Sequence, residues 1–188
     1  GNKNVVQALL DAGADVNARA STGASPLKMA ILGKHHDIVE MLLAKGGDPN
    51  SMERFGKTVL HQAVESNNAA IVKVLLAKGA NPNPKDSASG TPLIEALSGD
   101  IEIVRILIDA GADVNARSDT GWTPLMEAVN ARALAATKLL LSRGADVNAK
   151  ANDGTTALVY AIQGHTELVQ KTAQENSYNL PSLVLETQ

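Results

Sequence analysis

The residues able to do metal or acid–base chemistry are few, and their spacing does not assemble a reactive site. The four histidines stand at non-equivalent or distant positions, so no metal-ligand spacing emerges. They are His35, His36, His61 and His165. The chain contains no cysteine, which excludes a thiolate zinc site, a disulfide and a cysteine nucleophile. We therefore predict no bound metal and no cofactor.

Glu95 and Glu127 recur at matching positions, because each follows a leucine, Leu93 or Leu125, by two residues. Two carboxylates could share acid–base work. Catalysis would also need a closed pocket or a nucleophile, and the sequence supplies neither. The glycine-containing turns follow helices instead of preceding them, so they do not form a phosphate-binding loop. We predict that the chain is not an enzyme and that both glutamates are exposed polar residues.

Two short motifs that repeat in step indicate which elements carry these residues. The motif Gly-Ala-Asp-Val-Asn returns in related forms with spacings of 33, 33, 32 and 33 residues, beginning at Gly13, Gly46, Gly79, Gly111 and Gly144. A second motif, Ser/Thr-x-Leu with Pro in the middle of three copies, keeps the same spacings and begins at Ser25, Thr58, Thr91, Thr123 and Thr156. Two markers with one period indicate an internal repeat.

Each repeat is predicted to contain two short helices. A Ser or Thr before Pro is typical of a helix N-cap and first turn. Apolar residues follow at i, i+3 and i+4, as in Leu27, Ala30 and Ile31. A second helix, with apolar residues such as Ile38 and Leu42, ends at the marker glycine. One helix pair cannot bury its apolar faces alone, so the repeats must stack into an all-α solenoid.

The period and both markers resemble the ankyrin repeat over most of the chain, up to about residue 170. The resemblance implies an all-α ankyrin-repeat solenoid of helix-turn-helix units joined by β-turn or hairpin-like loops, in one domain over 1–188. Its units are a partial N-terminal repeat 1–18, the repeats 19–51, 52–84, 85–116 and 117–149, a C-terminal capping repeat 150–175 and a tail 176–188. Because the first unit lacks its first helix, we expect the chain to be part of a longer protein.

The resemblance also assigns roles to single residues. It implies that His61 bonds to the start of its own helix and that His165 is a turn residue of the repeat. The family usually has Gly in the turn between the two helices, where this chain has Lys34, Asn67 and Arg132. Asn adopts a positive φ more readily than Lys or Arg, so the geometry of these turns is left open.

The resemblance implies a partner-binding groove made of loop tips and exposed positions of the first helices. Phe55 and Trp122, the only Phe and Trp in the chain, fall on predicted tips. Exposed aromatic residues often anchor interfaces, although Trp122 could instead pack across a neighbouring loop. We predict partner contacts, all in or beside the tips, from Arg54, Phe55, Lys57, Lys85, Arg117, Asp119, Trp122 and Lys150.

A column of basic residues follows the marker asparagines in four of five repeats: Arg19, Lys85, Arg117 and Lys150, with Met52 in the remaining copy. The column could contact an acidic peptide or could be solvated charge. A formal charge of −3 argues against a nucleic-acid partner, and the apolar runs are too short to cross a membrane. We expect a cytoplasmic monomer, with the nucleus as an alternative location.

These observations favour a non-catalytic scaffold that binds a protein or peptide, with an acidic segment as one candidate. The alternative is a substrate-recruiting or regulatory segment of a larger protein, such as a ubiquitin ligase adaptor or a kinase.

Overall fold

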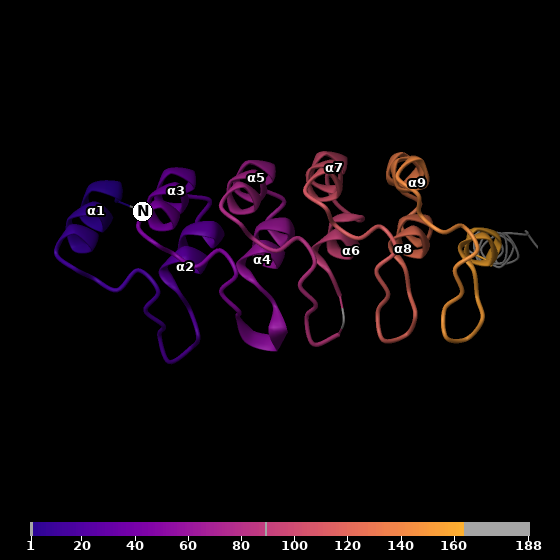
Figure 1. The fold of residues 1–188 in the computed structure, drawn as a ribbon, viewed down its shortest axis with the longest axis horizontal. Helices are drawn as coiled ribbons and strands as arrows, with labels where there is room; N and C mark the ends of the chain where they lie inside the picture. The colour runs from indigo at the N-terminus through magenta and orange to yellow at the C-terminus, as the bar shows by residue number, and fades with distance from the viewer. Residues whose placement is uncertain (1, 89, 164–188) are drawn as a thin grey trace, which may run out of the picture.

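The computed structural model describes residues 2–88 and 90–163, and its helices form two rows with loops projecting on one side (Figure 1). The inner row, beside the loops, contains α2 (Pro26–Leu32), α4 (Val59–Glu65), α6 (Pro92–Ala96) and α8 (Pro124–Asn130). The outer row contains α1 (Lys3–Asp11), α3 (His36–Ala44), α5 (Ala69–Ala77), α7 (Ile101–Asp109) and α9 (Leu134–Ser142). A further helix begins at 157 and is described as far as 163, and η1 (Arg54–Gly56), a single turn whose central residue has a left-handed φ, lies in one loop. The predicted all-α solenoid is confirmed.

The inner helices begin at the predicted N-caps. The hydroxyl oxygens of Ser25, Thr91 and Thr123 each accept a hydrogen bond from a backbone N–H three residues later, at 3.2–3.4 Å, and Pro follows each of them. Thr58 has no Pro after it, and its N–H instead donates to His61 Nδ1 at 3.0 Å. The predicted bond between His61 and the start of its helix is therefore confirmed.

Three of the four described turns between paired helices contain a residue other than glycine in the left-handed conformation, and the turn between α6 and α7 has no residue with a positive φ. The φ angles are 54° at Lys34, 49° at Asn67 and 55° at Arg132. Such a φ costs an ordinary L-residue about 1–2 kcal/mol, and less for Asn. The marker glycines after the outer helices also have positive φ, for example 92° at Gly46, as expected for a residue that ends a helix.

One apolar core runs through the stack. The first leucine of each inner helix is nearly inaccessible in α2, α4, α6 and α8, with exposed fractions of 2, 0, 1 and 3% at Leu27, Leu60, Leu93 and Leu125. Inner helices pack on the next inner helix and on their outer partner, and outer helices pack on the next outer helix. Each repeat is thus buried by its neighbours, as a stack of units without independent cores requires.

The marker asparagines join neighbouring loops. Asn17 accepts a hydrogen bond from the N–H of Asp48 at 2.9 Å and donates its amide N–H to the carbonyl of Gly46 at 3.0 Å. Asn50, Asn83 and Asn115 repeat both bonds one repeat further on. The sequence predicts only local bonds here, and those are made by residues such as Asp48, which accepts from the N–H of Asn50. The asparagines instead connect repeats.

The ends of the stack differ from its interior. Val5 and Leu9 of α1 are 53 and 57% exposed, whereas the matching Ile38 and Leu42 of α3 are 5 and 2% exposed. The inner helix α2 packs on α3, but within the described residues no inner helix is paired with α1. His165, the rest of the predicted capping repeat and the tail 176–188 lie outside the described residues. In the described part, no helix has the length and apolar run that a membrane crossing requires.

Candidate interaction surface

Trp122, at the fourth loop tip, contacts the side chains of Glu127 and Tyr160. Its indole N–H donates to a carboxylate oxygen of Glu127 at 3.0 Å, and its ring meets that of Tyr160 edge-on, with centroids 4.5 Å apart and planes inclined by 63°. Both rings are half-buried. Trp122 therefore does pack towards the next repeat, as one reading of the sequence allowed. Tyr160 was not among the predicted site residues, although it occupies the position of Glu95 and Glu127 in the following repeat.

A hollow of about 370 Å³ opens beside this ring pair, between the fourth and fifth loop tips. Its lining is Asp119, Thr120, Trp122, Ala151, Asn152, Asp153 and Tyr160. Asn152 joins the two tips, because its N–H donates to the carbonyl of Thr120 at 2.9 Å and its amide donates to the carbonyl of Asp119 at 2.7 Å. The two tips that form the walls of the hollow are therefore joined by two hydrogen bonds to loop carbonyls before any ligand arrives.

Gly121 permits this close approach of the two loops. Its φ is 76°, and a Cβ atom placed on it would lie 2.6 Å from Asn152 Oδ1 and 2.9 Å from the backbone nitrogen of Asn152. Any larger residue would both be strained and displace Asn152. Gly121 is therefore needed for the two tips to approach and form the hollow, although it does not itself line the hollow.

Phe55 is the other aromatic tip residue, and it is 75% exposed. Its φ is 60°, in the left-handed region, and its carbonyl accepts a hydrogen bond from the N–H of Ser87 in the next tip at 2.8 Å. A large apolar side chain is thus presented to solvent on a backbone that an aromatic residue adopts at a cost. The side chain of Arg54, also predicted to contact the partner, lies outside what the structure describes.

Lys57 occupies a tip position but points its ammonium into a polar cluster on the inner helices. It forms ion pairs with Glu65 and, at 2.6 Å, with Glu95. Burial acts to lower the pKa of Lys57, but the hydrogen bonds to the two carboxylates outweigh it and raise the pKa. Burial raises the pKa of Glu95, whose second oxygen is buried without a hydrogen-bond partner in the described part.

The expectation that Glu95 and Glu127 are exposed is therefore wrong. Both are only partly accessible, and each is engaged by a tip residue of its own or the preceding repeat: Lys57 bonds to Glu95, and Trp122 bonds to Glu127. The alignment of repeats correctly puts the two glutamates at equivalent positions, but it does not indicate which side chains bond to them.

The basic column is partly used to join loops. Lys85 donates to the carbonyl of Arg117 at 3.0 Å, and Arg117 donates to the carbonyl of Lys150 at 2.5 Å. All three side chains remain exposed. Two of the predicted partner-contacting cations therefore have an internal structural role as well.

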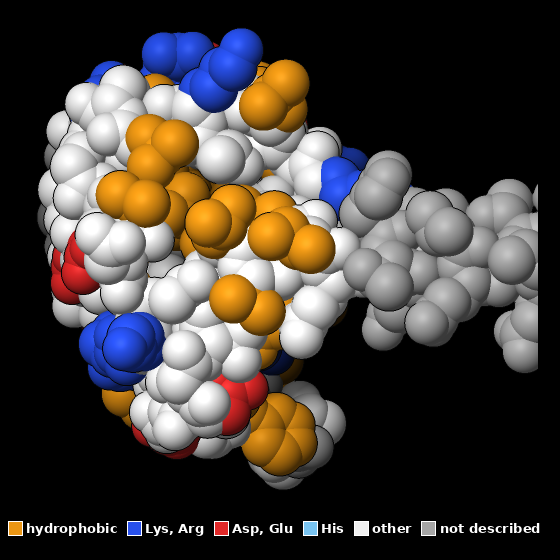
Figure 2. Space-filling view, turned by 90° about the vertical axis from the view of Figure 1, so that its right-hand side faces the viewer, with side chains coloured by type: hydrophobic (Ala, Val, Ile, Leu, Met, Phe, Trp, Pro, Cys, Tyr) orange, Lys and Arg blue, Asp and Glu red, His pale blue; other side chains and the backbone are white. Residues whose placement is uncertain are grey.

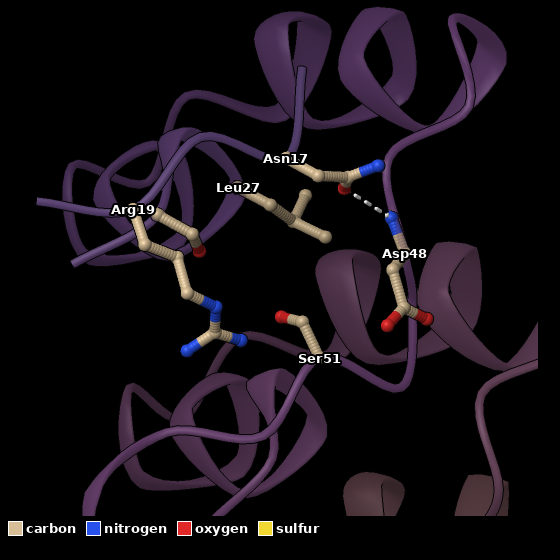
Figure 3. Close-up of a pocket in the computed structure, with 6 residues that line it drawn as sticks. Asn17, Arg19, Leu27, Asp48 and Ser51 are labelled. Atoms are coloured by element: carbon tan, nitrogen blue, oxygen red, sulfur yellow. Dashed lines mark hydrogen bonds between the residues drawn. The ribbon is translucent and has the colours of Figure 1, made fainter. Parts of the chain in front are cut away.

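Arg19, at the start of the column, faces a smaller hollow of about 210 Å³ (Figure 3). Its guanidinium extends towards Ser51, whose hydroxyl is buried and lacks a hydrogen-bond partner in the described part of the chain. On the other side the hydrogen bond between Asn17 and Asp48 crosses the hollow's edge. This space is a crevice between two loops that the asparagine contact holds together.

The last described helix, 157–163, exposes apolar side chains. Figure 2 looks from this side of the molecule, where hydrophobic side chains gather in the middle of the face. Leu158 and Ile162 are 67 and 60% exposed, whereas the matching Leu60 and Val64 inside the stack are 0 and 5% exposed. Within residues 2–88 and 90–163, no group of three or more His, Asp or Glu side chains is arranged to hold a metal ion.

Comparison with known families agrees with the geometry. A family model described as ankyrin repeats, in three copies, matches residues 1–86, 27–118 and 93–179. A search of curated proteins finds no match to the chain.

Proposed function

The chain belongs to the ankyrin-repeat family, and from this premise we propose that it binds a protein or peptide partner through its loop tips and inner helices, without catalysing a reaction. Ankyrin repeats are generally protein–protein interaction modules and generally non-catalytic. Since the same scaffold serves unrelated partners, the site must be argued from this chain's own surface.

The observation that carries the proposal is the placement of both large aromatic tip residues. Phe55 is 75% exposed, and Trp122 forms the wall of a hollow between two tips. Rigid aromatic side chains bury a large area at little entropic cost, and they are common energetic anchors of interfaces. Backbone bonds between tips, from Ser87 to Phe55 and from Asn152 to Thr120, support both positions before binding.

We propose that the aromatic tip residues make the main contacts with the partner and that the basic column contributes less. Lys85 and Arg117 are exposed but already donate to loop carbonyls, so acidic partner groups would meet charges that are partly engaged. Lys57 is committed to two carboxylates. In the proposed complex, the exposed column residues Lys85, Arg117 and Lys150 contribute mainly to specificity, whereas Asp119 belongs to the lining of the Trp122 hollow.

Affinity capture with the whole chain tests the proposal, with captured proteins quantified by mass spectrometry. The tip variants are Phe55→Asn, which suits the positive φ, and Trp122→Ala. The control is Leu134→Ala, which removes a side chain that is 65% exposed at the start of α9, away from the tips. Partners retained by wild type and control but lost from either tip variant, at equal helicity, support the proposal. Equal recovery on all four baits contradicts it.

A further inference from the structure

The hollow between the fourth and fifth tips has a charge pattern of its own. Among its lining residues, Asp119 and Asp153 are acidic and none is basic. Hydrogen bonds from Thr155 lower the pKa of Asp153, so its carboxylate is ionised at neutral pH. Arg117 is not part of the lining; its guanidinium lies beside Gly121 and donates to the carbonyl of Lys150. The side chains that line the hollow therefore carry only negative charge, which is complementary to a cation.

The aromatic wall suits the same charge. Trp122 and Tyr160 present two rings inclined by 63°, and a cation that lies against an indole or phenol face is attracted by the ring quadrupole. The indole N–H is held by the carboxylate of Glu127, which fixes the ring orientation and places a further negative charge at its edge. An aromatic face and flanking carboxylates together are the surroundings that a desolvated cation prefers.

The shape and rigidity of the hollow favour arginine over lysine. A guanidinium is planar, stacks on aromatic faces and pairs with carboxylates in a fork, whereas an ammonium is compact and more strongly hydrated. Asn152 holds the two tips together through two hydrogen bonds to the carbonyls of Thr120 and Asp119, so the loop backbones on either side of the hollow are positioned in advance. Binding then needs little ordering of the loops.

We propose that this hollow receives an arginine side chain of a protein partner, with the guanidinium against Trp122 and Tyr160 and its N–H groups directed to Asp119 and Asp153. The inference rests on the proposed function, because it names the group that a partner would insert at that surface. It also means that the partner contributes a basic side chain at this hollow, whereas the basic column would attract an acidic one.

The single tryptophan of the chain makes the hollow directly observable. In a nitrogen-labelled sample of the whole chain, the only indole N–H resonance belongs to Trp122. The probes are Nα-acetyl-arginine methylamide, its lysine counterpart and its citrulline counterpart, which keeps the shape of arginine but has no charge. We expect the arginine probe to shift this resonance saturably and to bind at least about fivefold more tightly than either of the others.

Charge variants test the carboxylates. Asp153→Asn and Asp119→Asn are each expected to weaken arginine binding by about fivefold, since the isosteric amides keep a hydrogen-bond acceptor but remove the charge. Asn already occupies the position of Asp119 in the following repeat, at Asn152, so that substitution suits the fold. The matched control is Glu40→Gln on α3, which removes an exposed carboxylate far along the stack and leaves arginine binding unchanged.

Several results would overturn the inference. An indole resonance that does not respond to the arginine probe, citrulline or lysine binding as tight as arginine binding, or equal binding by the Asp153→Asn variant would each do so. Partner capture that depends on Trp122 while the arginine probe has no effect would reject this inference and leave the proposed function standing. An arginine response of Trp122 without any partner whose capture depends on the tips would contradict the proposed function, and with it the assignment of the arginine to a protein partner.

Discussion

The stacking of repeats predicts that one leucine position has very different importance at two places in the chain. Leu107 of α7 and Leu9 of α1 occupy the same position of the repeat, but their exposed fractions are 0 and 57%. Leu107 is enclosed because α7 packs on α5, α6 and α9. Replacing each by Ala therefore removes the same atoms from two different environments.

Truncating a fully buried leucine costs about 2–5 kcal/mol, including the cavity left behind. We expect Leu107→Ala to cost about 3–4 kcal/mol, because rigid helices on three sides restrict collapse around the cavity. Leu9 remains largely in water in the folded chain, so Leu9→Ala should cost about 1 kcal/mol or less. The predicted difference between the variants is at least about 2 kcal/mol.

Urea unfolding measures this difference, followed by helix circular dichroism and by Trp122 fluorescence. The two signals need to be compared because a stack of repeats can unfold in parts. Equal destabilisation by the two substitutions, or a loss below about 1 kcal/mol for Leu107→Ala, would refute the assigned core register.

Three further predictions concern single residues. Phe55→Asn should leave stability unchanged or raise it by up to about 1 kcal/mol in urea unfolding, since Asn tolerates the φ of 60°; a clear loss would show that the side chain packs in the free chain. Asn83→Ala removes two hydrogen bonds to the next loop and should cost about 1–2 kcal/mol, and a loss below about 0.5 kcal/mol would contradict their role. Burial lowers the pKa of His61 below 6.5, so the unfolded chain binds a proton there that the folded chain does not. Stability should therefore fall as the pH is lowered from about 7 towards 5, and His61→Gln should reduce this dependence when unfolding midpoints are compared across pH.

The sequence predicts the helices and turns well because their causes are local. Ser25 before Pro26 sets a helix start, and the glycine at position 46 allows the positive φ that ends the preceding outer helix. The stacking follows from the repeated apolar stripe, because neither helix of a pair can bury its own. The turns at Lys34 and Arg132, whose geometry the sequence leaves open, take the same left-handed conformation as the turn at Asn67.

The interaction surface is less predictable because its contacts join different repeats. Nothing near Lys57 in sequence indicates its bond to Glu95, which lies 38 residues later. Trp122 likewise meets Tyr160 only because the stack places the next inner helix beside it. Comparing equivalent positions between repeats could have found Tyr160, since it replaces a glutamate in the column that contains Glu95 and Glu127. Finding the hollow itself required the loop backbones.

Hydrogen exchange on the complex with a captured partner tests most directly where the partner binds. The backbone amides of residues 118–122 and 151–155 are predicted to exchange more slowly in the complex than in the free chain, while those of α3 and α5 in the outer row keep their free rates. Protection confined to the outer helices, with the tips unchanged, would contradict the proposed binding surface.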